Sequence, residues 1–405
     1  MKIFGRIELN RRRLWSEDSF PIKLELGLFV GATAALSLYK IFVNDWNNYR
    51  IFYFSFEHLR QGLQLYTLYP DQYFDLFKYS PSFAALMSPF SFFSLEIGAI
   101  LWNILGVLSF WTGIRRFFPT SPPRGLLCAL LLPELIGQIQ NFQSNALLAG
   151  ILLHGFADFQ KQRWWSAGLL ISLAFHVKLF GAALGALSLL WGGRAFLREG
   201  VWSLFFLVLV SLTPLFWVTP SELLVIYKDW LELLKWDQGS SQGASFMGVF
   251  RSFFGLTLPN LGTQLVSFLI MAGSWIIHLN RSQQTEAAAL SRLRGFSLLL
   301  VWMIVFNHKS ESPTFIIGMT GFALWFLNFT PRTSPPRSKW KSPLLWITLV
   351  FVSVLSSDLI PPNWKTQWIQ PLEMKVWPLL ALWFCLVFRD YYDFFKSRGS
   401  RTAAV

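Results

Sequence analysis

The chain has 405 residues, of which 53% are hydrophobic and only 14% are charged, and its mean hydropathy is +0.43. This composition excludes an ordinary soluble globular protein and indicates a polytopic membrane protein. The formal net charge of +13 could suggest a nucleic-acid partner, but the placement of the charges along the chain argues against one. The two cysteines, Cys128 and Cys385, both fall in apolar segments, so they predict neither a disulfide framework nor a metal site.

Apolar segments recur along the whole chain and predict an all-α membrane fold. A helix needs about 20 apolar residues to cross the hydrocarbon, so we expect about 12 transmembrane or re-entrant helices. They lie near residues 25–43, 82–114, 125–140, 144–158, 164–178, 180–192, 200–218, 261–279, 296–307, 312–328, 343–360 and 374–389. The segment 82–114 is too long for one straight helix, and Pro89, Ser91 and Ser94 predict a broken or re-entrant piece before the true span.

Lysine and arginine residues gather on one side of this topology. With a cytoplasmic N-terminus, 24 of the 35 Lys and Arg residues lie in inner segments and 9 in outer segments, as the positive-inside tendency requires. No small-residue cleavage pattern follows the first apolar run, so we expect this run to stay as an anchor. We predict a single integral-membrane domain over 1–405, in a cell membrane such as the bacterial inner membrane. Both termini are expected to be cytoplasmic, and two long outer loops span 44–80 and 219–260.

Each long outer loop contains a segment with amphipathic helical spacing. Residues 50–64 predict a helix lying flat at the interface, with these side chains toward lipid: Ile51, Phe54, Phe56, Leu59 and Leu63. Residues 221–236 predict a second helix, with one apolar stripe: Leu223, Leu224, Tyr227, Trp230, Leu231 and Leu234. Such helices can seat a loop on the bilayer or contact substrate, and the sequence leaves both interpretations open.

Asp45 follows the first span directly and is the leading candidate for a catalytic group. One interpretation is a helix N-cap, because an aspartate there satisfies free amide donors. The other is a general base at the water–membrane boundary, which deprotonates an acceptor hydroxyl. Partial burial, which raises the pKa of a carboxylate, would favour the second role.

Three further polar clusters adjoin predicted outer ends of spans. Gln140, Asn141, Gln143 and Asn145 either hydrogen-bond neighbouring helices or bind a sugar. His176 and Lys178 end another span, where Lys178 either reaches back to the surface or binds a lipid phosphate. The third cluster predicts a phosphate or sugar site rather than a metal site, and consists of Asn307, His308, Lys309, Ser310, Glu311 and Ser312.

The order of these features matches a known pattern. After the acid Asp45 come G-x-x-L-Y from Gly62 to Tyr66, and Y-x-P-x-F-A-x-L-x-x-P from Tyr79 to Pro89. Then follow W-x-x-L at Trp102, Q-x-N at Gln143 and Asn145, and a lysine, Lys178, at the end of the next span. This order resembles glycosyltransferase family 87, the polyprenyl-phosphate-mannose-dependent mannosyltransferases of the GT-C membrane fold. Phe142 and Leu179 stand where the family usually has glycine and proline, and the segment 307–315 resembles a branch-specific form of a late outer loop.

The resemblance implies an integral-membrane glycosyltransferase whose site faces the non-cytoplasmic side. It implies inverting transfer of a hexose, with mannose expected, from a polyprenyl-phosphate donor to a glycan or glycolipid acceptor. The first-loop acid, here Asp45, would be the general base. Neither a nucleotide nor another cofactor is expected, and the sequence contains no Walker or dinucleotide glycine pattern.

These clusters combine into one hypothesis about roles. Asp45 is the base, and the donor phosphate is bound by Lys178 with help from Lys309, His308 or Arg50. Sugar and acceptor contacts are expected from Gln143, Asn145, Asn307, Glu311, Trp46, Tyr49 and Trp230, with Trp236 as a further stacking face. The partners are therefore the lipid-linked donor, a glycan or glycolipid and membrane lipid, with no nucleic acid. A transporter or lipid flippase, or a scaffold subunit, remains an alternative at this point.

Overall fold

The computed structural model describes residues 20–118, 124–240, 242–281, 285–329, 342–357 and 359–402. Within these ranges the regular structure is helical throughout. The chain forms two compact units: unit 1 takes the described residues within 1–121 and 135–237, and unit 2 takes those within 122–134 and 238–405. The single domain over 1–405 stays a prediction.

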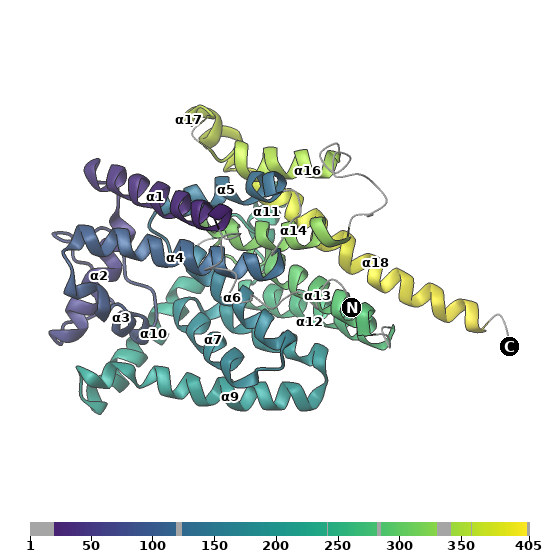
Figure 1. The fold of residues 1–405 in the computed structure, drawn as a ribbon, viewed down its shortest axis with the longest axis horizontal. Helices are drawn as coiled ribbons and strands as arrows, with labels where there is room; N and C mark the ends of the chain where they lie inside the picture. Colours follow the sequence, from purple (N-terminus) through teal and green to yellow (C-terminus); the bar gives the residue numbers. More distant parts are fainter. Residues whose placement is uncertain are drawn as a thin grey trace. The chain divides into compact units, whose positions relative to one another are not determined.

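Unit 1 is a bundle in which long apolar helices pack in sequence, α1 on α4, α4 on α6, α6 on α7 and α7 on α9 (Figure 1). Its helices are α1 (Phe20–Phe42), α2 (Asn47–Arg60), α3 (Pro81–Leu86), η3 (Ser88–Phe92), α4 (Leu95–Phe117), α6 (Asn145–Gln160), α7 (Trp164–Val177), η4 (Leu179–Ala182), α8 (Ala183–Ala186), η5 (Leu187–Trp191), α9 (Gly193–Ser211) and η6 (Thr213–Phe216). α5 (Arg124–Gln140) and α10 (Pro220–Ser240) each cross the division between the units. A Cβ added at Gly150 of α6 would lie 2.3 Å from Ser109 Oγ of α4, so this small residue lets the two helices approach closely.

Unit 2 centres on α13, which packs against α12, α14 and α18. Its helices are α11 (Phe246–Phe254), α12 (Asn260–Arg281), α13 (Thr285–Val305), η7 (Ser312–Thr314), α14 (Phe315–Phe329), α16 (Pro343–Thr348), η8 (Leu349–Val354), α17 (Pro362–Trp364), η9 (Lys365–Ile369), η10 (Met374–Val376) and α18 (Trp377–Thr402). α14 is almost wholly buried, and Phe322 and Phe326 on it are fully enclosed. Apolar surface on all sides of a helix is what a position inside a membrane bundle requires.

Six helices among the described residues are long and apolar enough to cross a membrane, and a seventh candidate is a helix pair bent by 75°. Three more predicted segments form shorter apolar helices, over Trp164–Val177, Leu179–Trp191 and Pro343–Val354. The chain is therefore an all-α, multi-pass membrane protein, as predicted. The expected number of about 12 spans includes several helices that are too short to cross the hydrocarbon when straight.

The predicted break within 82–114 is confirmed. The six residues of α3 and the turn η3 precede α4, and Pro89 lies at the start of η3. Ser94 then begins α4, because its Oγ accepts a hydrogen bond from Ile97 N at 3.4 Å. Serine at this position supplies an acceptor for the free amides at a helix start, so the sequence itself specifies the restart.

The prediction that residues 50–64 lie flat on lipid is wrong for most of the segment. Ile51, Phe56 and Leu59, three of the residues expected to face lipid, are at most 5% exposed. The ring of Phe52 on the same helix lies 5.2 Å from Phe83 and 5.5 Å from Trp102, centroid to centroid. An amphipathic face can be buried by protein as well as by lipid, and here α3 and α4 cover α2.

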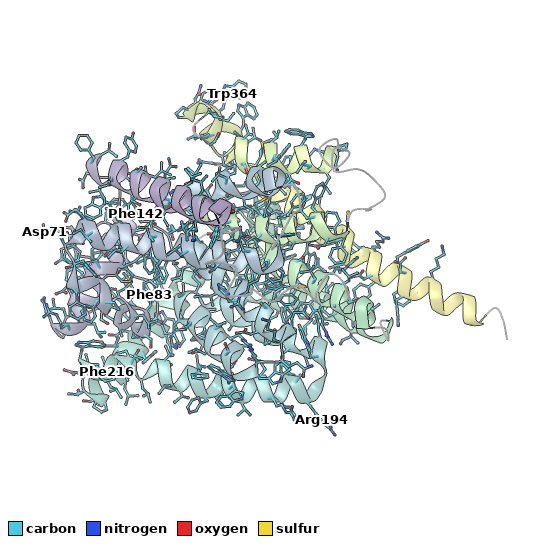
Figure 2. All side chains as sticks on the ribbon, in the orientation of Figure 1. Asp71, Phe83, Phe142, Arg194, Phe216 and Trp364 are labelled. Carbon is cyan, nitrogen blue, oxygen red and sulfur yellow. The ribbon has the colours of Figure 1, made fainter. Side chains whose placement is uncertain are left out.

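The two ends of unit 1 differ in character. At one end Arg115 pairs with Glu25 at 2.8 Å and Arg116 approaches Asp158 at 3.5 Å, which joins α4 to α1 and α6. The opposite end carries α2, the first outer loop and the ends of α1 and α7. Figure 2 shows Arg194 at the first end, with Asp71 and Phe216 at the other. Which end faces the cytoplasm stays a prediction of the charge pattern.

Candidate functional site

Asp45 lies in a sharp turn between α1 and α2. Asn44 has a positive φ of 56°, and Asp45 N donates to Lys40 O at 2.9 Å, which reverses the chain. The Asp45 side chain is 68% exposed and forms an ion pair with Lys40. Trp46 occupies the N-cap of α2, and no side chain caps that helix end. The helix-cap interpretation of Asp45 is therefore wrong. The exposed carboxylate also lacks the partial burial that would favour the role of base.

The first turn of α2 stacks three of the predicted site residues. The rings of Trp46 and Tyr49 are parallel within 6°, with centroids 6.5 Å apart, and the Arg50 guanidinium lies 5.4 Å from the Trp46 ring. Trp46 is 5% exposed and Tyr49 is fully buried, so little ring surface is open to a sugar. Tyr49 Oη and Arg50 Nε have no hydrogen-bond partner among the described residues. Sugar stacking on these rings stays a prediction.

The turn before α6 is held from two sides. Asn48 Nδ2 of α2 donates to Asn141 O at 2.8 Å, and Trp102 Nε1 of α4 donates to Phe142 O at 3.2 Å. Phe142 has a φ of 48°, in the left-handed region that glycine adopts most easily. The glycine that the family pattern has at this position thus corresponds to a real backbone requirement, which Phe142 meets at a cost in strain.

Gln143 and Asn145 follow in this turn, and Gln138 of α5 organises both. Gln138 Oε1 accepts from Asn145 N at 3.1 Å, and Gln138 Nε2 donates to Gln143 O. Asn145 is 1% exposed, yet neither its Oδ1 nor its Nδ2 has a hydrogen-bond partner among the described residues. Ordinary helix–helix hydrogen bonding therefore does not explain this amide, and an unsatisfied buried amide costs about 1–3 kcal/mol.

Tyr79 and Ser80 join this turn to the end of α7. Tyr79 Oη lies 3.2 Å from Ser144 Oγ, and Ser80 Oγ donates to His176 O at 2.9 Å. Lys178, half-buried, ends α7 with φ −152° and ψ 126°. That extended backbone is the one a following proline would impose, so the conformation persists with Leu179 in place of the usual proline. Two clusters that are separate in the sequence thus become neighbours.

Trp230 anchors α10 inside unit 1. Its Nε1 donates to Lys78 O at 3.3 Å, its ring makes an edge contact with Phe175 at 6.3 Å, and it is 5% exposed. Leu223 on the same helix is also buried, whereas Leu224 and Leu231 are 74% and 53% exposed. One part of the predicted stripe therefore packs on protein and another part is exposed. A sugar contact by Trp230 stays a prediction.

The cluster at 307–312 belongs to unit 2, where it forms a structured turn. Gly243 N donates to His308 O at 2.7 Å and Ala244 N donates to Ser310 O at 3.1 Å, so the segment that follows α10 pairs with this turn. Asn307 Oδ1 accepts from Lys309 N at 3.1 Å. His308 Nδ1 lies 3.3 Å from Gln264 Nε2. The Asn307 side chain is thus used inside the turn, while Glu311 is exposed; the binding roles of these residues stay predictions.

Sequence reasoning missed several residues that hold these clusters in place. Lys40 and Lys375 fall in the predicted spans 25–43 and 374–389, and no role was predicted for either. In the structure Lys40 pairs with Asp45, and Lys375 Nζ lies 3.0 Å from Glu134 Oε2 in unit 2. Ser80 was read only as part of a motif. A lysine five residues before an acid was the one available signal for Lys40.

Among the described residues, no three His, Cys, Asp or Glu side chains come together in a way that could hold a metal ion.

Comparison with known proteins gives one family match. The model of glycosyltransferase family 87 matches residues 77–306, which is more than half of the chain. No curated protein sequence matches significantly. Among solved structures, the chain is similar to ArnT from Cupriavidus metallidurans bound to undecaprenyl phosphate, with 15% identity and a TM-score of 0.39. That alignment covers 90% of this chain and 77% of the ArnT chain.

Proposed function

Because the chain belongs to glycosyltransferase family 87, and is thus a membrane glycosyltransferase, we propose that it transfers a hexose from a polyprenyl-phosphate donor to a glycan or glycolipid. We expect the hexose to be mannose, the transfer to be inverting and the site to face the non-cytoplasmic side. Because this family consists of enzymes, a transporter or a scaffold subunit is no longer needed to explain the chain. The GT-C fold class follows from the same membership.

The observation that carries this proposal is the joining of three polar features at one end of unit 1. The turn at 141–145 contacts α2 through Asn48 and contacts Ser80 and the end of α7 through Tyr79. Asp45 precedes α2 at the same end. A lipid-linked sugar brings a phosphate, sugar hydroxyls and an apolar tail together. An end of a membrane bundle that offers cations, amides and a carboxylate matches this chemistry.

In the proposed reaction Asp45 accepts the proton of the acceptor hydroxyl. The hydroxyl oxygen forms a bond to the anomeric carbon from one side, while the bond from that carbon to the phosphate oxygen breaks on the other. One displacement of this kind inverts the anomeric configuration. The exposure of Asp45, 68% for the side chain, lets a hydroxyl reach it.

Polyprenyl phosphate leaves with the electron pair and gains negative charge. Lys178, with Arg50, is proposed to neutralise that charge, since charge-assisted hydrogen bonds to phosphate oxygens strengthen as the charge develops. Asn145 is proposed to bind a sugar hydroxyl, which would supply the partners that its buried amide lacks among the described residues. Reaching this amide requires its side chain to turn or the 141–145 turn to open, because the amide is 1% exposed at present.

The direct experiment incubates purified protein with polyprenyl phosphates carrying radiolabelled mannose, glucose or galactose, together with a membrane glycolipid extract. We expect label to move from the lipid donor to the extract with one sugar, and expect that sugar to be mannose. If none of the lipid donors in the panel lost its label, the proposed donor class would be wrong. Transfer from a nucleotide sugar in the absence of any lipid donor would contradict it as well.

A further inference from the structure

The segment of unit 2 that precedes α18 leaves two large rings exposed. It contains α17 and η9, over Pro362–Ile369. Trp364 and Trp368, one helical turn apart on this segment, are 60% and 62% exposed (Figure 2). Within 361–371 only Ile369 is buried, so the segment lies on the surface of the described structure. A helix of this length extends about 12 Å, which is too short to cross a membrane.

The other side of this segment is polar and almost without charge. Its exposed polar side chains are Asn363, Thr366, Gln367 and Gln370. Between Pro361 and Pro371 the sequence has one charged residue, Lys365, which is half-buried. Because residues two apart on a helix point to roughly opposite sides, Thr366 faces away from both tryptophans. Apolar rings on one side and polar groups on the other are typical of a helix that lies between lipid and water.

The ends of α12, α13, α14 and α18 meet at this end of unit 2. Gln264, near the start of α12, has its Nε2 3.3 Å from Nδ1 of His308, which lies in the turn between α13 and α14. Lys375, just before α18, has its Nζ 2.7 Å from Oγ of Ser312, just before α14. Helices that are long and apolar enough to cross a membrane end at its two faces. This end of unit 2 therefore marks one boundary of the bilayer.

The bend before α18 turns the exposed segment along that boundary. The segment and α18 meet at an angle of 75°. Trp377 Nε1, at the start of α18, donates to Leu372 O at 3.0 Å and ties the end of the segment to that helix. Membrane-crossing helices are tilted by about 20° from the bilayer normal on average. With α18 crossing the bilayer, the segment thus runs closer to the membrane plane than to the normal.

A second exposed apolar group lies beside the first. It consists of Phe253, Phe254 and Leu256, at the end of α11 and just after it. The Phe253 ring lies 5.7 Å from the Trp377 ring, centroid to centroid. Asn260, the first residue of α12, accepts at its Oδ1 a hydrogen bond from Gln242 Nε2 at 2.9 Å, which holds the loop around α11 to that helix. Both exposed groups therefore adjoin the start of a membrane-crossing helix.

We propose that these two groups form one interface surface, consisting of Phe253, Phe254, Leu256, Trp364 and Trp368, that binds the lipid–water boundary of the bilayer. Its rings lie at the headgroup ends of the acyl chains, in the leaflet where α12 and α18 begin. Lipid is the occupant because the surface is continuous with helices that already lie in the bilayer, and because contiguous exposed apolar surface is unfavourable in water. Tryptophan suits this depth, since it combines an apolar ring with one N–H donor for headgroup oxygens.

Fluorescence quenching in phosphatidylcholine vesicles tests the proposed depth. Cys128→Ser with Cys385→Ser gives a cysteine-free background for the full chain, and a fluorophore is attached through Trp368→Cys or, in a second protein, through Trp364→Cys. The quenchers are a phospholipid with a nitroxide near the headgroup end of its acyl chain, one with the nitroxide near the methyl end, and iodide in the water. We expect the shallow nitroxide to quench both labels roughly twofold more strongly than the deep one.

Thr366→Cys in the same background is the matched control, because Thr366 is exposed on the opposite side of the same segment. Its label should be quenched roughly twofold more strongly by iodide than the labels at 364 and 368. Phe254→Cys places a label in the second group and should behave like the two tryptophan positions. Thermal unfolding in detergent should be the same for all these variants and the background, since each replaced side chain is exposed, and this verifies that they fold.

Three outcomes would overturn the inference. Iodide quenching at 364 and 368 as strong as at 366 would place the rings in water. Labels that no reagent quenches would mean that protein, either unit 1 or a second copy of the chain, covers the surface. Stronger quenching by the deep nitroxide would mean that the bent pair enters the hydrocarbon. The measurement uses no sugar donor, so its result does not depend on the proposed glycosyl transfer.

Discussion

The end of unit 1 that carries Asp45 and the Lys375–Glu134 pair of unit 2 differ in how their charged groups are exposed. At the end of unit 1 with the catalytic candidate, the Asp45 carboxylate is 68% exposed, while Trp46, Tyr49 and Asn145 are buried. In unit 2 one ion pair is buried, since the side chains of Lys375 and Glu134 are 8% and 5% exposed. An exposed carboxylate can meet a substrate hydroxyl at little cost in stability. A buried ion pair instead fixes geometry, and losing either partner is expensive.

The largest effect should come from Asp45→Asn. If Asp45 is the base, the variant should lose about 10²–10⁴-fold in the transfer rate, because amide nitrogen cannot accept the proton. Expression and thermal stability should be unchanged, since the side chain is exposed. The measurement is sugar transfer from the lipid donor, with Asp71→Asn, another exposed carboxylate of the same loop, as the control. An Asp45→Asn protein as active as this control would remove the base assignment.

Lys375→Met should have the largest effect on stability. It leaves Glu134 buried without its cation, at a cost of about 3–5 kcal/mol. Thermal unfolding of the purified protein in detergent measures this, with Lys228→Met as the control, because Lys228 and Glu232 form an exposed pair at 3.9 Å. The double variant Lys375→Met with Glu134→Leu should recover most of the loss. Equal stability of Lys375→Met and the control would mean that burial of the pair contributes little.

Phe142→Gly tests whether the buried ring or the backbone strain dominates in the 141–145 turn. The ring is fully buried, and truncating it should cost about 3–5 kcal/mol, whereas relief of the left-handed strain returns about 1–2 kcal/mol. We therefore expect a net loss of about 1–4 kcal/mol. Gln162→Gly is the matched control, because Gln162 is exposed with φ 54° and should gain stability. A more stable Phe142→Gly would show that strain outweighs packing.

The smallest effect concerns His58 on α2. Burial lowers its pKa, opposed by the hydrogen bond of its Nε2 with Gln72, and Glu57 nearby favours the charged form. In the unfolded chain His58 titrates near 6.5, so the unfolded state takes up a proton first. Neutral His58 therefore stabilises the folded protein at a pH above the pKa of the unfolded chain. This stabilisation is lost as the pH falls through the lowered pKa that His58 has in the folded protein.

Thermal unfolding between pH 8 and pH 5 checks this expectation. His58→Phe keeps an aromatic ring beside Tyr69, whose centroid lies 3.8 Å from that of His58, and removes the titration. Acidification should lower the melting temperature of the wild type more than that of the variant. Parallel pH profiles for the two proteins would contradict the prediction.

Features that depend only on residues close together in the sequence were predictable from it. Hydropathy predicted the membrane class and the helical fold, and Pro89 with Ser94 predicted the restart before α4, because helix breaking and capping act within one turn. The family pattern has glycine where this chain has Phe142, but no backbone conformation was predicted there, and the structure gives φ 48°. The face of α2 was misjudged, since amphipathic spacing does not distinguish burial by lipid from burial by protein.

The sequence by itself determined that this chain is a multi-pass, all-α membrane protein of a glycosyltransferase family, and it singled out Asp45. Only the tertiary structure decided which polar groups have partners. Ser80 and His176 are 96 residues apart in sequence, and Glu134 and Lys375 are 241 apart. Hydropathy and caps are local properties of a chain, whereas pairing across such distances depends on how helices pack. For that reason Asp45 was visible in the sequence, whereas the pairing of Glu134 with Lys375 was not.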